Sequence, residues 1–98
     1  HLPRRGVSAS FAEMEGRRFV GVSNIGTRPT VASSPVGTVE TWFPDYQGDL
    51  YGRELRLTLT GFLREIRRFE NLGELKAQID RDSEEARRLL DEWKTEEK

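Results

Sequence analysis

A single carboxylate, Glu40, lies in the middle of an alternating stretch and is the strongest candidate for a catalytic base in this chain. Side chains alternate between two faces along a strand, so Glu40 lies on one face, and Val39 and Phe43 lie on the other. A carboxylate held on a strand beside a cavity can accept a hydroxyl proton, especially where partial burial raises its pKa. Most charged strand residues are simply solvated, so an outward-facing Glu40 is the alternative interpretation.

A second candidate is the segment 24–30, which follows an apolar stretch and reads as a loop. It begins at Asn24. A phosphate could be bound here by backbone N–H groups near Gly26, by threonine hydroxyls and by the forked guanidinium of Arg28. The alternative is an ordinary loop in which the glycine supplies a positive φ and Pro29 stiffens the chain. The chain contains no Gly-Lys-Ser or Gly-Lys-Thr sequence, so this is not a Walker-type loop.

Aromatic and basic side chains form a third group of candidates. Trp42, Tyr46 and Tyr51 could stack on a planar ligand, although aromatic residues more often fill a core or cover strand edges. An arginine cluster could grip a phosphate or stack on a flat ring, and it consists of Arg64, Arg67 and Arg68. Its alternative is a solvated face that pairs with Glu65 and Glu70.

The first two thirds of the chain predict strands that would position these residues. Turn residues separate four candidate strands, at 6–11, 17–23, 38–43 and 53–63. Glu15 and Gly16 predict a hairpin turn between the first two. Alternate positions from 55 to 59 are leucine, a pattern typical of a half-buried antiparallel strand, and Gly61 predicts a bulge or bend after them.

The last third predicts helix. Asn71 followed by Glu74 resembles a capping box, and an apolar stripe at helical spacing follows it. Polar residues 80–83 interrupt the stripe, and Asp82 with Glu85 could cap a second helix, so we expect a short helix, a break and a longer helix. Strands followed by helices predict an α+β, mainly β, fold, in which the strands close into a small antiparallel barrel.

Length and composition predict one small soluble domain. The chain has 98 residues, of which 35% are hydrophobic and 34% charged, which suits a modest core and a solvated surface. A net charge of −1 gives no field that attracts nucleic acid or a membrane surface, and the lack of cysteine excludes disulfides and zinc–thiolate sites. His1 is isolated, so no metal ligand is expected there. We expect a cytoplasmic protein without nucleic-acid or membrane partners.

Taken together, these motifs resemble the riboflavin kinase family, and in particular the C-terminal kinase module of bacterial bifunctional riboflavin kinase/FAD synthetases. The similarity rests on Gly-Val-Ser-Asn-Ile-Gly-Thr-Arg-Pro-Thr at 21–30, then on residues 39–41, 45–46, 48–52, 63–64, 68–69 and 72–79, followed by Asp82 and 86–87. The resemblance implies a six-stranded antiparallel Greek-key barrel with a C-terminal helix. It also implies transfer of the γ-phosphoryl group of ATP to the 5′-hydroxyl of riboflavin, giving FMN.

The resemblance implies a role for several side chains. Glu40 matches the catalytic glutamate of the family, which would orient the ribityl hydroxyl and accept its proton. Tyr46 and Tyr51 match the segment that walls the nucleotide pocket, and Arg64 lies where the flap of the family meets the flavin. The implied cofactors and substrates are ATP, Mg²⁺ and riboflavin, and the implied partner is an N-terminal FAD synthetase (adenylyltransferase) domain in the full protein.

The chain also departs from the family. A Pro-Thr-Ala-Asn motif that holds Mg²⁺ and the ATP phosphates is absent from it. The resemblance therefore implies that residues 1–98 are a riboflavin kinase domain without its first strand and its glycine-rich, Mg²⁺-binding loop, inactive when alone. Trp42 replaces the usual histidine, and Ile66 replaces the usual glutamate two places after the flap arginine.

Two other functions are compatible with the same residues. One is a non-catalytic relative or fragment that binds a flavin or a nucleotide without turnover. The other is a small barrel that binds oligonucleotides, as such barrels often do. The near-neutral charge argues against the second, because nucleic-acid-binding domains usually carry a basic stripe.

Overall fold

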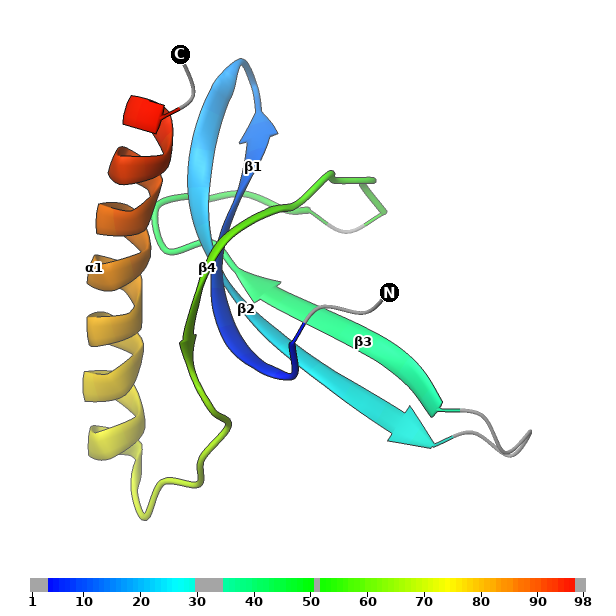
Figure 1. Cartoon of the computed structure of the whole chain (residues 1–98), viewed down its shortest axis with the longest axis vertical. Helices are drawn as coiled ribbons and strands as arrows, with labels where there is room; N and C mark the ends of the chain where they lie inside the picture. Colours follow the sequence, from blue (N-terminus) through cyan, green and yellow to red (C-terminus); the bar gives the residue numbers. More distant parts are fainter. Residues whose placement is uncertain (1–3, 30–34, 51, 97–98) are drawn as a thin grey trace.

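The computed structural model describes residues 4–29, 35–50 and 52–96. It contains four strands and one helix: β1 (Gly6–Met14), β2 (Arg17–Pro29), β3 (Pro35–Trp42), β4 (Thr58–Arg64) and α1 (Leu72–Glu96). The strands form one strongly curled sheet, and α1 runs along one side of it (Figure 1). The prediction of a mainly β, α+β fold is confirmed.

The sheet has Greek-key connectivity. Its strand order is β3-β2-β1-β4, and every neighbouring pair is antiparallel. The first three strands follow one another as hairpins, and the long connection of residues 43–57 brings β4 back beside β1, which is the Greek-key arrangement. This part of the prediction is confirmed, whereas the further strand that would complete a barrel stays a prediction.

The hairpin between β1 and β2 turns at the two predicted residues. Glu15 and Gly16 have φ values of 55° and 78°, and Met14 pairs with Arg17 directly across the turn. Two consecutive positive φ angles are typical of a type I′ turn, whose twist matches that of the strands. A positive φ is uncommon for a residue other than glycine, so Glu15 is a mildly strained position.

The last strand begins later than the sequence predicts. β4 starts at Thr58, not at residue 53, and the preceding Leu55 and Leu57 pack into the core without pairing in the sheet. The predicted irregularity at Gly61 is confirmed, because the register with β1 shifts beside it. A Cβ atom at Gly61 would lie 3.0 Å from a methyl group of Leu89, so the glycine also allows α1 to approach β4 closely.

The two predicted C-terminal helices are one continuous helix, so that prediction is wrong. The start is as expected: the Asn71 side chain accepts the backbone N–H of Glu74 at 2.9 Å. Asp82 does not cap a second helix but is buried in the middle of α1, with its carboxylate bound by other side chains. The hydroxyl of Ser83 donates to the Ile79 carbonyl at 2.8 Å, so neither side chain competes for the helical N–H groups.

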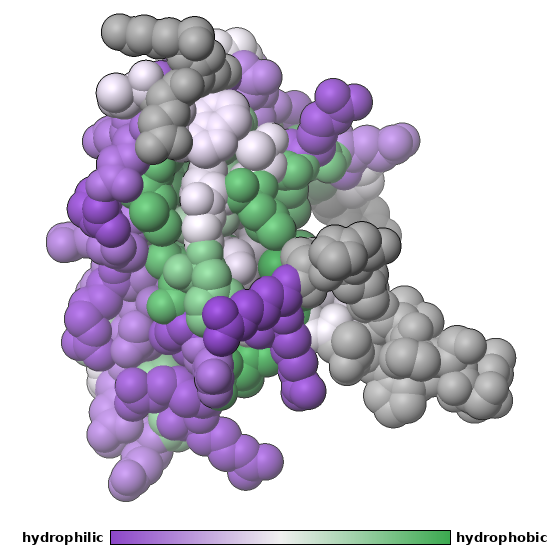
Figure 2. Space-filling view, viewed as in Figure 1, coloured by the Kyte–Doolittle hydropathy of each residue, from purple (hydrophilic) through white to green (hydrophobic). Residues whose placement is uncertain are grey.

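Two apolar clusters hold the sheet and helix together. The first lies between the sheet and α1, where the ring of Phe11 meets that of Trp93 edge-on at 5.0 Å. The second lies on the other face of the sheet, around Met14, Phe19 and Phe43, and is covered by the 43–57 connection. Hydrophobic residues gather in the middle of the face drawn in Figure 2, beside the hydrophilic helix side. No helix in the described ranges has the length and apolar character that a membrane span requires.

An exposed ion pair fastens the 43–57 connection to α1. Arg87 donates to both carboxylate oxygens of Asp45, at 3.1 and 2.8 Å, and this hydrogen bonding lowers the pKa of Asp45. A lowered pKa in the folded state stabilises the fold above the unfolded-state pKa, and this stabilisation is lost as the pH falls through the folded-state value.

We therefore expect Asp45→Asn to lower the free energy of unfolding by less than about 1 kcal/mol at pH 7, because the pair is half exposed. The difference from the wild type should shrink at pH values below 3.8, the ordinary pKa of the group. Urea unfolding of both proteins at a series of pH values measures it. If the difference stayed constant down to pH 2, the stabilisation would not come from the ionised carboxylate of Asp45.

Candidate functional site

A groove opens between the sheet and the N-terminal half of α1. Its volume is about 480 Å³, and it collects three of the six site residues predicted from the sequence, Asn24, Glu40 and Arg64. They come from β2, β3 and β4 in turn, and the helix contributes Ile79 and Asp82 to the opposite wall. The Greek-key order thus brings residues far apart in sequence to one site.

Strand pairing places the two polar residues of the sheet wall together. Glu40 on β3 lies directly opposite Asn24 on β2, so both side chains leave the same face of the sheet. Trp42 is two residues after Glu40 and therefore shares that face, opposite Val22. Glu40 is exposed, so its carboxylate is accessible to a ligand in the groove and can accept a proton from a hydroxyl group.

The predicted phosphate-binding loop is largely strand. Residues 24–29 continue β2 and pair with β3 as far as Pro29 and Pro35, forming an arm that projects beyond β1 (Figure 1). Pairing with β3 overrides the local glycine and proline signals. The side chain of Arg28 and the whole of Thr30 lie outside the described residues, so the role of Arg28 stays a prediction.

Arg64 is tied to the helix by a bidentate ion pair. Its Nε lies 3.2 and 3.1 Å from the two carboxylate oxygens of Asp82, and its NH2 group donates to Oδ2 at 2.9 Å. Its NH1 group donates to the carbonyl oxygen of Glu65 at 3.2 Å. Sequence reasoning missed Asp82 as a site residue, although a carboxylate between Ile79 and Ala86 on the apolar stripe was the available signal.

Of the aromatic residues predicted to bind a ligand, Trp42 lines the groove and Tyr46 does not. The Tyr46 hydroxyl donates to Glu15 at 3.0 Å and accepts from Arg53 at 3.3 Å, and its ring meets Phe19 at 5.0 Å. Phe19 is five residues before Asn24 on β2, which is roughly 17 Å along a strand, so Tyr46 does not join the groove. Tyr51 lies outside the described residues. The nucleotide-binding roles of both tyrosines stay predictions.

The groove continues into an apolar extension beyond Trp42. A second cavity of about 480 Å³ shares Trp42 and Ile79 with the first and is otherwise lined mainly by the first turns of α1, with Leu72 and Leu75. Trp42 is 48% exposed and Leu72 81% exposed, so large apolar side chains here face solvent. The apolar stripe of the helix is typical of core residues, so the sequence does not predict this half of the groove.

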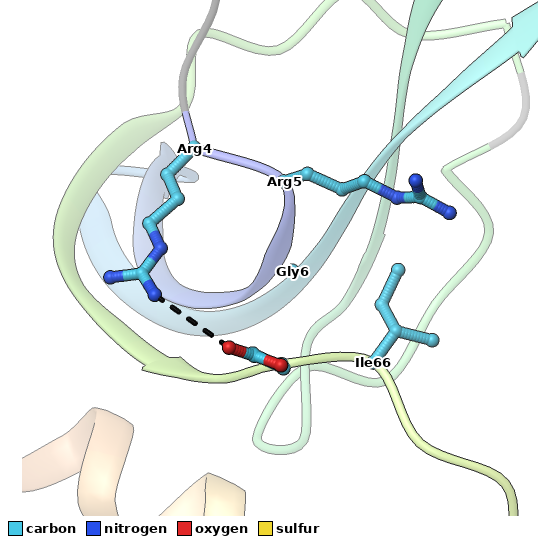
Figure 3. Close-up of a pocket in the computed structure, with 5 residues that line it drawn as sticks. Arg4, Arg5, Gly6 and Ile66 are labelled. Atoms are coloured by element: carbon cyan, nitrogen blue, oxygen red, sulfur yellow. Dashed lines mark ion pairs between the residues drawn. The ribbon is translucent and has the colours of Figure 1, made fainter.

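A separate pocket of about 340 Å³ lies at the N-terminal end of β1 (Figure 3). Arg4 approaches Glu65 at 4.0 Å and covers the Phe62 ring at 3.8 Å, while Arg5 extends away from Arg4. Ile66 lines this pocket and not the groove, although it is only two residues after Arg64. The pocket collects none of the predicted site residues.

The described residues do not fit a Mg²⁺ site. Within the described ranges no group of three or more histidine, cysteine, aspartate or glutamate side chains is placed to hold a metal ion. In the groove, Asp82 is already bound by Arg64 and Gln78, which leaves Glu40 as the accessible carboxylate there.

A Greek-key sheet covered by one helix, with an accessible carboxylate beside a groove that has an apolar extension, defines a small β domain with one candidate binding groove of mixed polarity. The chain belongs to the riboflavin kinase family: the family model for Flavokinase (riboflavin kinase) matches residues 1–90. The identification made from the sequence motifs is confirmed.

Similar proteins agree with this assignment. The chain is 40% identical over 88 residues to a bifunctional riboflavin kinase/FMN adenylyltransferase of Pseudomonas fluorescens, covering 90% of this chain and 28% of that protein. It is 49% identical over 70 residues to the Escherichia coli K12 protein of the same name, covering 71% and 22%. The chain thus spans less than a third of the length of these two relatives.

Among solved structures, the fold resembles the crystal structure of a macrolide-efflux protein from Streptococcus pneumoniae. The TM-score is 0.76 at 21% sequence identity, and the match covers 89% of this chain and 28% of the other. At this identity the similarity concerns the fold alone.

Proposed function

We propose that this domain transfers the γ-phosphoryl group of ATP to the 5′-hydroxyl of riboflavin, giving FMN and ADP. The observation that carries the proposal is the groove in which Glu40 and Asn24 stand beside an apolar extension. Riboflavin has a matching division, because a polar ribityl chain with a terminal hydroxyl is attached to a large, flat, mainly apolar ring. Membership of the riboflavin kinase family supports the same conclusion.

The division of the groove suggests how riboflavin binds. The ring would lie in the apolar half, against Trp42 and Ile79, and the ribityl chain would extend toward Glu40. Trp42 suits this role, since its half-exposed indole offers a flat surface without a large rearrangement.

In this arrangement Glu40 acts as the general base. Its carboxylate accepts the proton of the 5′-hydroxyl while the oxygen attacks the γ-phosphorus, and the bond from that phosphorus to the leaving ADP oxygen breaks. The Asn24 amide, directly across the ladder, can donate a hydrogen bond to the same hydroxyl or to a phosphate oxygen. Mg²⁺ supplies charge neutralisation to such reactions, and the described residues offer no site for it. We also propose that an adenylyltransferase domain accompanies this domain in the full protein, as in the relatives.

Formation of FMN from riboflavin, ATP and Mg²⁺, followed by chromatography, tests the proposal in the full protein. The expected result is one FMN and one ADP per riboflavin consumed. Binding of riboflavin without FMN formation would favour the non-catalytic alternative instead.

Trp42→Ala is expected to weaken riboflavin binding about tenfold, because loss of a stacking surface removes about 0.5–1.5 kcal/mol in addition to the apolar contact area. Quenching of riboflavin fluorescence on titration measures the dissociation constant. Trp42→Phe is the matched control and should retain most of the affinity. Equal affinity of the alanine variant and the wild type would mean that the ring lies elsewhere.

A further inference from the structure

The ion pair between Arg64 and Asp82 is largely buried. The side chains are 21% and 5% exposed, whereas both partners are more exposed than 40% in the α1 pairs Asp45–Arg87, Glu85–Arg88 and Arg88–Glu92. Burial of a carboxylate is unfavourable unless its oxygens are paired and hydrogen-bonded. Asp82 meets this condition, because Arg64 and the amide of Gln78 together bind both oxygens.

The pair joins two walls of the groove. Arg64 is the last residue of β4, and its NH1 group also holds the carbonyl oxygen of Glu65, the first residue of the connection to α1. Asp82 lies one helical turn after Ile79, which lines both halves of the groove. Four groups therefore set the position of the helix wall relative to the end of the sheet: the Arg64 guanidinium, the Asp82 carboxylate, the Gln78 amide and the Glu65 carbonyl.

The proposed base is held by a different set of contacts. Glu40 is placed by the pairing of β3 with β2, from Trp42 to Pro35, and that pairing involves neither β4 nor α1. A change at Asp82 should therefore move the apolar wall and leave the carboxylate that accepts the proton in place.

We propose that Asp82 is a positioning residue for riboflavin: through Arg64 it holds the helix wall where the ring binds, and so it sets affinity for the flavin and not the rate of phosphoryl transfer. This inference rests on the proposed function. It also changes the role of Arg64 implied by the family resemblance, because at least three of its N–H groups are engaged within the protein and hold the wall.

Two variants in the full protein test the proposal. Asp82→Asn keeps the size of the side chain but removes its charge, and Arg64→Lys keeps the charge opposite Asp82 but removes the fork that binds both oxygens. In each we expect the dissociation constant for riboflavin, measured by fluorescence quenching, and the KM for riboflavin to rise about tenfold. The kcat should stay within about twofold and its pH profile should not change.

Asp45→Asn is the matched control. It breaks a second bidentate aspartate–arginine pair between α1 and the rest of the fold, and neither partner lines the groove or its apolar extension, so riboflavin affinity should be unchanged. Circular dichroism on all three variants identifies any that fails to fold. If Asp82→Asn unfolds, Arg64→Lys decides the question.

The possible failures are distinguishable. Normal riboflavin affinity in a folded Arg64→Lys or Asp82→Asn protein, or a fall in kcat at constant affinity, would overturn the role of Asp82 while leaving the proposed function standing. Wild-type protein that neither bound nor phosphorylated riboflavin would overturn both.

Discussion

Glu40→Gln in the full protein is expected to lower the kcat for riboflavin phosphorylation by about 10²- to 10⁴-fold, the usual contribution of a general base. The amide keeps the size and hydrogen-bonding capacity of the side chain but cannot accept the hydroxyl proton. Affinity for riboflavin should change little, since Glu40 does not line the apolar extension in which we propose that the ring binds. Steady-state assays with ATP, Mg²⁺ and riboflavin measure the first quantity, and fluorescence titration measures the second.

Glu54→Gln is the control for this substitution. Glu54 is also an exposed glutamate, but it lies in the 43–57 connection and does not line the groove. Its replacement should leave both kcat and riboflavin affinity unchanged. Near-normal turnover in the Glu40 variant would remove this carboxylate from the mechanism, whatever the control shows.

Phe11→Ala is expected to lower the free energy of unfolding by about 3–5 kcal/mol, the usual cost of truncating a buried phenylalanine. Phe11 is 5% exposed, lies in the cluster between the sheet and α1, and meets the Trp93 ring edge-on at 5.0 Å. Small domains are stable by only about 5–15 kcal/mol, so the variant should be close to unfolding. Riboflavin binding should weaken as well, because α1 forms a wall of the groove.

Urea unfolding followed by circular dichroism measures this loss. Leu72→Ala is the control for stability, because Leu72 is 81% exposed at the start of α1 and its truncation should cost less than about 1 kcal/mol. Similar losses in the two variants would mean that the Phe11 cluster does not hold the helix on the sheet.

Local patterns were sufficient to predict several parts of the fold. The period of two in the strands, the turn at Glu15 and Gly16, and the cap at Asn71 depend on neighbours within a few residues. The grouping of Glu40 with Arg64 was reached through the family resemblance, because residues on different strands meet only once the strand order is known.

The features that were missed depend on distant partners. Asp82 looks like a helix cap until its partner Arg64, 18 residues earlier in the chain, is placed beside it. Gly26 and Pro29 predict a loop until β3 pairs with that segment. Local propensity cannot predict such pairings, since their free energy comes from contacts between elements that are separate in sequence.

We expect riboflavin to bind in the groove beside Glu40, with its ring on Trp42. The chain contains two tryptophans, and the second, Trp93, lies near the other end of α1 against Phe11. Nitrogen-15 spectra of the two indole N–H groups during a riboflavin titration therefore test the claim directly, with Trp42→Phe to assign the signals. We expect the Trp42 signal to move in a saturable way while the Trp93 signal stays in place. A stationary Trp42 signal at saturating riboflavin, or a shift confined to Trp93, would contradict it.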